Sequence, residues 1–153
     1  DLANAEFHDI LPGSSIQPVE DTSLRLIDHG LEILSRLKAK AFFALSGDQR
    51  KAEDGEIPVL VYNSHPYPVT ATIECEFNLP DQNRTGSFID VKVFSNGNPI
   101  PCQVEKENSN LNYLDWRKKV VFQADLKPSQ INRFDCKLVE LPMKPAIFSN
   151  LGT

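Results

Sequence analysis

The sequence lacks the features that would point to a membrane or a nucleic acid. No stretch of about 18 apolar residues occurs, so we expect no membrane-spanning helix. Acidic residues outnumber basic ones, 21 to 16, and the net charge of −5 argues against binding to nucleic acids or to anionic membranes. Glycine-rich phosphate loops and the GxSxG and HExxH motifs are also absent. The 41% apolar and 24% charged residues are typical of an ordinary globular protein.

Cysteine is scarce as well. The three cysteines, Cys75, Cys102 and Cys136, have no CxxC spacing, which argues against a disulfide framework or a zinc knuckle. Each cysteine occupies an apolar position in a segment that alternates apolar and polar residues. We therefore interpret all three as buried, reduced thiols.

Charge and proline content divide the chain into two zones. Residues 1–56 hold 11 acidic and 6 basic residues, residues 57–153 hold 10 of each, and nine of the 11 prolines lie in the second zone. We predict part of a helical bundle with a charged linker over 1–56, a β-sandwich region over 57–142 and a further linker over 143–153. Because the chain starts without Met, in what reads as the middle of a helix, we interpret it as a segment of a longer protein.

The first zone predicts two helices. Residues 2–11 read as the end of a helix that Pro12-Gly13 terminates. Apolar residues at three-to-four spacing predict a long second helix that is capped by one of residues 21–23 and ends near residue 46, with Gly47 in the left-handed position. This helix has two apolar stripes, so it needs more than one packing partner. We expect a helix-mediated homodimer of the chain.

The second zone predicts antiparallel strands, because the apolar period changes to two. Asn96-Gly97 is a strong signal for a tight hairpin, and residues 127–130 read as another turn. The predicted fold class is α+β, with the helical segment followed by an antiparallel β-sandwich of about six strands. The expected strands are 57–63, 69–77, 88–94, 100–105, 118–126 and 133–141.

Few residues suggest chemistry. Of the three histidines, His29 in the long helix and His65 in a proline-rich loop read as structural. His8 differs, because it precedes Asp9 at a forced helix end, an arrangement that suits a metal site or a hydroxyl-rich ligand. One histidine cannot form a zinc site alone, so a structural role stays open. The segment 113–117, YLDWR, could stack on a sugar or simply begin a strand.

Two motifs resemble known enzymes. Residues 6–15, EFHDILPGSS, resemble the His-Asp segment and small-residue turn of family 38 glycoside hydrolases, the α-mannosidases. The form of this motif resembles the bacterial and cytosolic branch, because Phe7 stands where the lysosomal and Golgi branch has an additional histidine. Residues 59–64, VLVYNS, are similar to the strand that opens the β region of that family. The likeness in motifs and element order covers most of residues 1–142.

The resemblance implies a central segment of a retaining, zinc-dependent α-mannosidase that lacks the N-terminal catalytic domain. The matching positions make His8 a zinc ligand and Asp9 a contact to the substrate sugar. The catalytic carboxylates and the other metal ligands of the family lie in that N-terminal domain, so the resemblance implies no catalytic residue here and an inactive chain on its own. It also implies an α-mannoside or oligosaccharide substrate and a cytoplasmic location.

Two other functions fit the same residues. The chain could be a stand-alone helix-plus-sandwich module that binds carbohydrate or another protein. It could also be a structural domain that binds no ligand.

Overall fold

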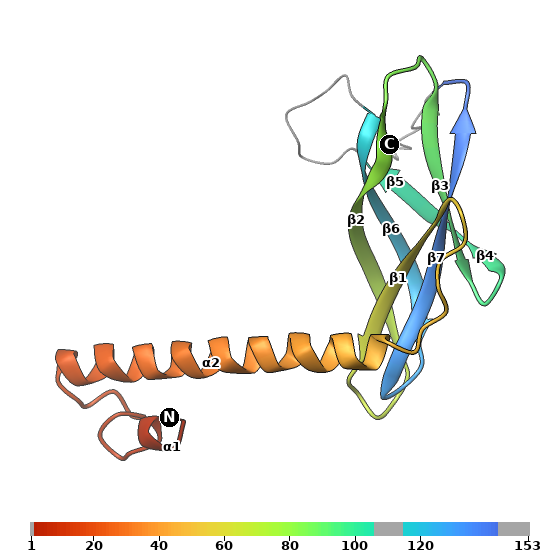
Figure 1. The fold of residues 1–153 in the computed structure, drawn as a ribbon. Coiled ribbons are helices and arrows are strands. Elements are labelled where there is room, and N and C mark those ends of the chain that lie inside the picture. Colours follow the sequence, from red (N-terminus) through yellow and green to blue (C-terminus); the bar gives the residue numbers. More distant parts are fainter. Residues whose placement is uncertain (1, 106–114, 144–153) are drawn as a thin grey trace, which may run out of the picture. The chain divides into compact units, whose positions relative to one another are not determined.

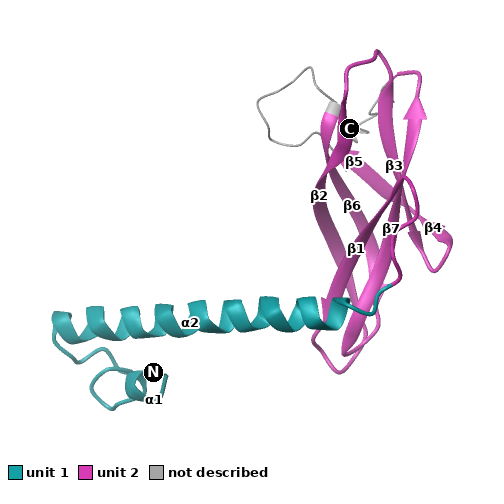
Figure 2. Ribbon diagram, in the orientation of Figure 1, with its two compact units in different colours: residues 1–49 teal, residues 50–153 magenta. Residues whose placement is uncertain are grey.

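A computed structural model of the chain describes residues 2–105 and 115–143, and it confirms the α+β fold class (Figure 1). The chain divides into two compact units, residues 1–49 and residues 50–153 (Figure 2). The first unit is helical and the second consists of antiparallel strands. Within the described ranges, no helix combines the length and the apolar character that crossing a membrane requires.

The first unit contains a short helix, α1 (Leu2–Ala5), and a long helix, α2 (Gln17–Ser46). The predicted helix over 2–11 is wrong beyond Ala5, because residues 6–13 form successive turns instead. In these turns the Ile10 N–H donates to the Phe7 carbonyl (2.9 Å) and the Gly13 N–H to the Ile10 carbonyl (3.0 Å). Gly13 has a φ of 74°, a conformation that glycine adopts without strain. The turns therefore hold residues 6–13 outside any helix.

Helix α2 begins earlier than its sequence suggests. Pro18 lies in its first turn, where a missing backbone N–H leaves no hydrogen bond unmade, and not in a preceding connector. Thr22 and Ser23 do not cap the helix, since each hydroxyl donates to the carbonyl four residues before it (2.8 Å). Gly47 has a φ of −62°, so the predicted left-handed position is also wrong. The chain continues in a right-handed turn, in which the Gln49 N–H donates to the Ser46 carbonyl.

The second unit contains seven strands in two sheets (Figure 1). The strands are β1 (Glu56–Asn63), β2 (Val69–Asn83), β3 (Phe88–Ser95), β4 (Asn98–Ile100), β5 (Cys102–Glu105), β6 (Asp115–Leu126) and β7 (Gln130–Leu141). One sheet has the order β1-β7-β3-β4 and the other the order β2-β6-β5, and all pairings are antiparallel. Asn96 and Gly97 join β3 to β4 with φ values of 50° and 81°, which confirms the predicted hairpin.

The predicted strand 100–105 is divided between the two sheets. Pro101 separates β4 from β5, and it has no N–H to donate to a ladder. Before it, Ile100 pairs with Val93 of β3, and after it Cys102 pairs with Phe122 of β6. The chain therefore crosses from one sheet to the other at this proline. This division gives one strand more than the approximate number predicted.

The core lies between the two sheets. Val91, Val93, Val120, Phe122, Leu126, Phe134 and Cys136 are its buried members. The rings of Phe122 and Phe134 meet across it with centroids 5.0 Å apart. The three cysteines are free and lie on the core side, but the predicted burial holds only for Cys136, because Cys75 and Cys102 are half-buried. A hydrogen bond with the Cys75 thiol, together with burial, raises the pKa of Cys136 above its usual value.

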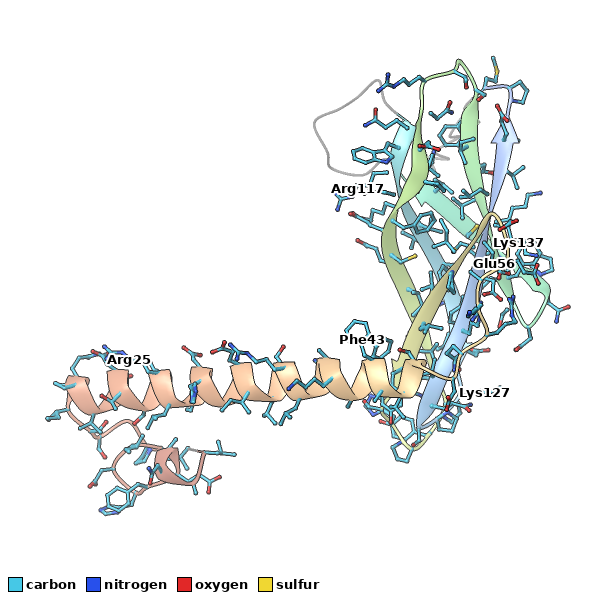
Figure 3. All side chains as sticks on the ribbon, viewed as in Figure 1. Arg25, Phe43, Glu56, Arg117, Lys127 and Lys137 are labelled. Atoms are coloured by element: carbon cyan, nitrogen blue, oxygen red, sulfur yellow. The ribbon has the colours of Figure 1, made fainter. Side chains whose placement is uncertain are left out.

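A network of charges attaches the segment before β1 to β7. The Arg50 guanidinium lies 3.0 Å from carboxylate oxygens of both Glu56 and Asp135, and the Arg133 guanidinium donates to Asp135 (2.7 Å) and to the Arg50 carbonyl. Figure 3 labels Glu56 and its register partner on β7, Lys137. The segment predicted as a charged linker up to residue 56 is thus part of the second unit from Arg50 onward. The other predicted linker, 143–153, lies outside the described residues from position 144.

Candidate functional site

His8 and Asp9 lie side by side in the turns that follow α1. The His8 Nε2 atom is 3.2 Å from an Asp9 carboxylate oxygen, and the side chains are 76% and 57% exposed. The Phe7 ring contacts the imidazole with a centroid separation of 4.3 Å. The Ser14 hydroxyl donates to the Asp9 carbonyl (3.3 Å), which ties the two ends of the turn together. Both functional groups are therefore open to a ligand that approaches this turn.

An apolar groove of about 450 Å³ lies between α1, these turns and α2. Phe7 and Ile10 line it on one side, and Val19 and Leu26 of α2 line it on the other. Phe7 and Ile10 border this groove, although Phe7 remains 55% exposed, and His8 lies at the surface.

The described residues do not bring other metal ligands to His8. Within the ranges 2–105 and 115–143, no group of three or more His, Cys, Asp or Glu residues could hold a metal ion. His29 lies on α2, and His65 lies in the second unit, where its ring stacks on Tyr67 with centroids 5.0 Å apart. One imidazole supplies one of the three or four protein ligands that zinc normally has. His8 therefore fits zinc only as one member of a larger ligand set.

A second candidate site lies where β2 departs from its partner β6. Asn78 pairs with Arg117 and Asn83 with Asp115, so residues 79–82 of β2 face the single residue Trp116. This large bulge borders a cavity of about 400 Å³, lined by Pro80, Asp81, Gln82, Arg84 and Trp116. Bulges of this kind redirect side chains and are over-represented beside active sites.

The sequence pointed to only part of this second site. Trp116 belongs to the segment YLDWR, which suggested sugar stacking, but Tyr113 lies outside the described residues. Arg117 pairs with Glu76 (2.6 Å) and does not line the cavity. The polar lining from β2 was missed because the expected strand ended at residue 77, whereas β2 continues to Asn83 and includes Pro80, a residue type that often marks a bulge in a strand.

Neither the known protein-family models nor the curated proteins include a match to this chain. Functional proposals for the chain therefore depend on the residues of these two sites.

Proposed function

We propose that the chain is part of a retaining α-mannosidase similar to family 38 glycoside hydrolases, in which His8 is one zinc ligand and Asp9 contacts the substrate sugar. The observation that supports this proposal most is the exposed His8–Asp9 pair, 3.2 Å apart, on a turn in which the Ser14 hydroxyl donates to the Asp9 carbonyl. An exposed imidazole beside a carboxylate suits a metal that also contacts sugar hydroxyls. The three free thiols agree with the proposed cytoplasmic location, because reduced cysteines persist there.

The roles that the proposal assigns to His8 and Asp9 follow from the chemistry of zinc and of sugar hydroxyls. When bound, zinc acts as a Lewis acid that grips sugar hydroxyls. His8 would donate a nitrogen lone pair to the metal, and Asp9 would accept a hydrogen bond from a hydroxyl of the mannoside. A retaining mechanism also needs two carboxyl groups about 5–5.5 Å apart on either side of the scissile bond. The proposal assigns those groups to another part of the enzyme, so the chain alone is expected to be inactive.

The test compares His8→Ala with His29→Ala in an active α-mannosidase that carries this segment. Loss of one ligand should remove zinc and aryl α-mannoside hydrolysis together, while the control histidine on α2 should affect neither. Metal content by mass spectrometry and the circular dichroism spectrum separate loss of zinc from loss of fold. Stoichiometric zinc and a near-normal rate in His8→Ala would show that His8 is structural.

We further propose that a second copy of the chain packs on α2. Within the first unit, α1 lies on the side of α2 that carries Val19 and Leu26. The remaining apolar side chains on α2 are largely exposed, and Figure 3 labels one of them, Phe43. They include Leu24 (55% exposed), Leu31 (59%), Leu34 (62%), Leu37 (56%) and Phe43 (73%). Covering each such side chain stabilises a complex by roughly 1.5–3 kcal/mol before the entropy cost of association.

The charges on α2 favour an antiparallel pair. Residues 17–32 carry four acidic residues and one basic residue, and residues 33–46 carry three basic residues and no acidic one. In an antiparallel pair, the acidic half of each helix lies beside the basic half of the other, whereas a parallel pair would place like charges together. The partner that these charges match best is therefore α2 of another copy.

Light scattering at micromolar concentration tests this association. The expected species has about twice the 17.2 kDa mass of one chain. Leu31→Glu should dissociate it, since a buried charge opposes the contact, whereas His29→Glu, at an exposed polar position of the same helix, should leave the dimer intact. A monomer at these concentrations, or equal behaviour of the two variants, would contradict the proposal.

A further inference from the structure

The cavity at the bulge of β2 has a fixed frame. Leu79, the first bulge residue, is only 5% exposed and anchors the segment in the apolar interior. On the other side, the Asn83 side chain accepts from the Thr85 N–H (3.0 Å) and donates to the Ser87 carbonyl (2.9 Å), which fixes the turn that carries Arg84. Binding a ligand here would therefore cost little ordering of the backbone.

Several polar groups of this cavity have no partner within residues 2–105 and 115–143. Among the residues that the structure describes, nothing forms a hydrogen bond or ion pair with the Asp81 carboxylate or the Trp116 indole N–H. Within the described part of the chain, the Arg84 guanidinium donates one hydrogen bond, to the Gln82 side-chain oxygen (3.2 Å), which leaves its other donors and the Gln82 amide group available there. The cavity thus presents hydrogen-bond donors and acceptors beside an aromatic ring.

The combination selects for a neutral, hydroxyl-rich ligand. A partly buried indole offers a flat apolar surface against which the C–H face of a pyranose ring can pack. A carboxylate accepts from hydroxyl groups, and a guanidinium donates to hydroxyl and ring oxygens. Asp81 and Arg84 together contribute no net charge, so a charged ligand gains no net attraction that would offset the cost of removing it from water. The cavity volume of about 400 Å³ lies within the ~300–1,000 Å³ range of small-molecule sites.

We propose that this cavity on the β-sandwich binds a neutral pyranoside, such as one terminal unit of an oligosaccharide, with Trp116 packing on the ring and Asp81 accepting from its hydroxyl groups. The site is a binding site and performs no reaction. The proposal does not rest on the α-mannosidase assignment, because neither His8 nor Asp9 contributes to it. A chain that lacks all glycosidase function could still use this site to hold a glycan.

The chain supplies its own probe, because Trp116 is its single tryptophan. The full chain is titrated with methyl α-mannoside, mannobiose, cellobiose and lactose, with glucuronic acid and glucosamine as charged counterparts, while its fluorescence is recorded. At least one neutral sugar should give a saturable change with a dissociation constant of about 1 mM, as expected for a small open site. The charged counterparts should bind more weakly.

Two matched variants locate the binding. Asp81→Asn keeps the shape of the side chain and should weaken binding about tenfold, because a charge-assisted hydrogen bond becomes a neutral one. Asp54→Asn makes the same change at an exposed position before β1 and should have no effect. Trp116→Ala, followed by ligand-observed nuclear magnetic resonance, should abolish binding while circular dichroism shows an intact sandwich. The proposal is overturned if no neutral sugar gives a saturable change, or if the two Asp→Asn variants bind equally.

Discussion

The Asn63 side chain holds the corner between β1 and β2, and changing it gives a sharp test of the fold. Its Nδ2 atom donates to the carbonyls of Tyr67 (3.0 Å) and Leu126 (3.3 Å), and its Oδ1 atom accepts from the His65 N–H (3.0 Å). The residue is only 4% exposed, so water cannot replace these bonds. Asn63 therefore joins a loop, the end of β6 and its own strand.

Asn63→Asp removes the two donated bonds with almost no change in shape. The carboxylate can still accept from His65, but it has no hydrogen to donate and faces two carbonyl oxygens. Each unsatisfied buried group costs about 1–3 kcal/mol, which gives a loss of roughly 3 kcal/mol in the free energy of unfolding. At about 4 °C per kcal/mol for a unit of this size, the melting temperature should fall by about 12 °C.

Urea denaturation followed by the fluorescence of Trp116 measures this loss in the second unit. The matched control is Asn98→Asp, which makes the same change at an exposed position of β4 and should shift stability by less than about 0.5 kcal/mol. At pH 4 the gap between Asn63→Asp and the wild type should narrow, because a protonated acid regains one donor. A loss at pH 7 no larger than that of the control would refute the role assigned to Asn63.

Three further predictions concern other parts of the second unit. A hydrogen bond from Arg50 lowers the pKa of Glu56 below its ordinary value of 4.5, so its stabilising effect is present above that pH and is lost as the pH falls through the lowered value. As the pH falls, the stability of Glu56→Gln should therefore decrease less steeply than that of the wild type, as acid unfolding followed by circular dichroism can show. Equal dependence of stability on pH in the two proteins would contradict this. Burial should protect Cys136 from iodoacetamide until urea is added, as mass spectrometry can show. Gly97→Ala should cost about 1 kcal/mol because φ is 81° there, whereas Gly86→Ala should be nearly neutral in the same denaturation assay.

The elements that sequence reasoning predicted correctly are those that a local pattern determines. The alternation of apolar residues placed the strands of the sandwich, and Asn96-Gly97 determined the β3–β4 hairpin because both residues accept positive φ values. The errors fall where two local signals compete. Pro18 fits a connector as well as it fits the first turn of a helix. In the structure it lies in the first turn of α2, and the local sequence does not distinguish the two positions.

Sheet membership could not be predicted from any single strand. Residues 100–105 alternate without a break in hydrophobicity, yet Pro101 transfers the chain from the partner β3 to the partner β6. The turn at 127–130 was predicted at the correct place, but it joins strands of different sheets and forms no hairpin. Pairing depends on contacts between segments distant in the sequence, which a periodicity of two does not encode.

The two candidate sites differ in how far the sequence could predict them. His8 and Asp9 are neighbours in sequence, so a short motif is enough to identify them. The sugar-binding proposal needs Asp81 and Trp116 to meet, and they are brought together only because β2 carries extra residues opposite one residue of β6. A register shift of this kind has no fixed spacing in the sequence, and Pro80 is its only local trace. Sites built across strands therefore depend on the register of the sheet, whereas sites within one turn can be found from the sequence.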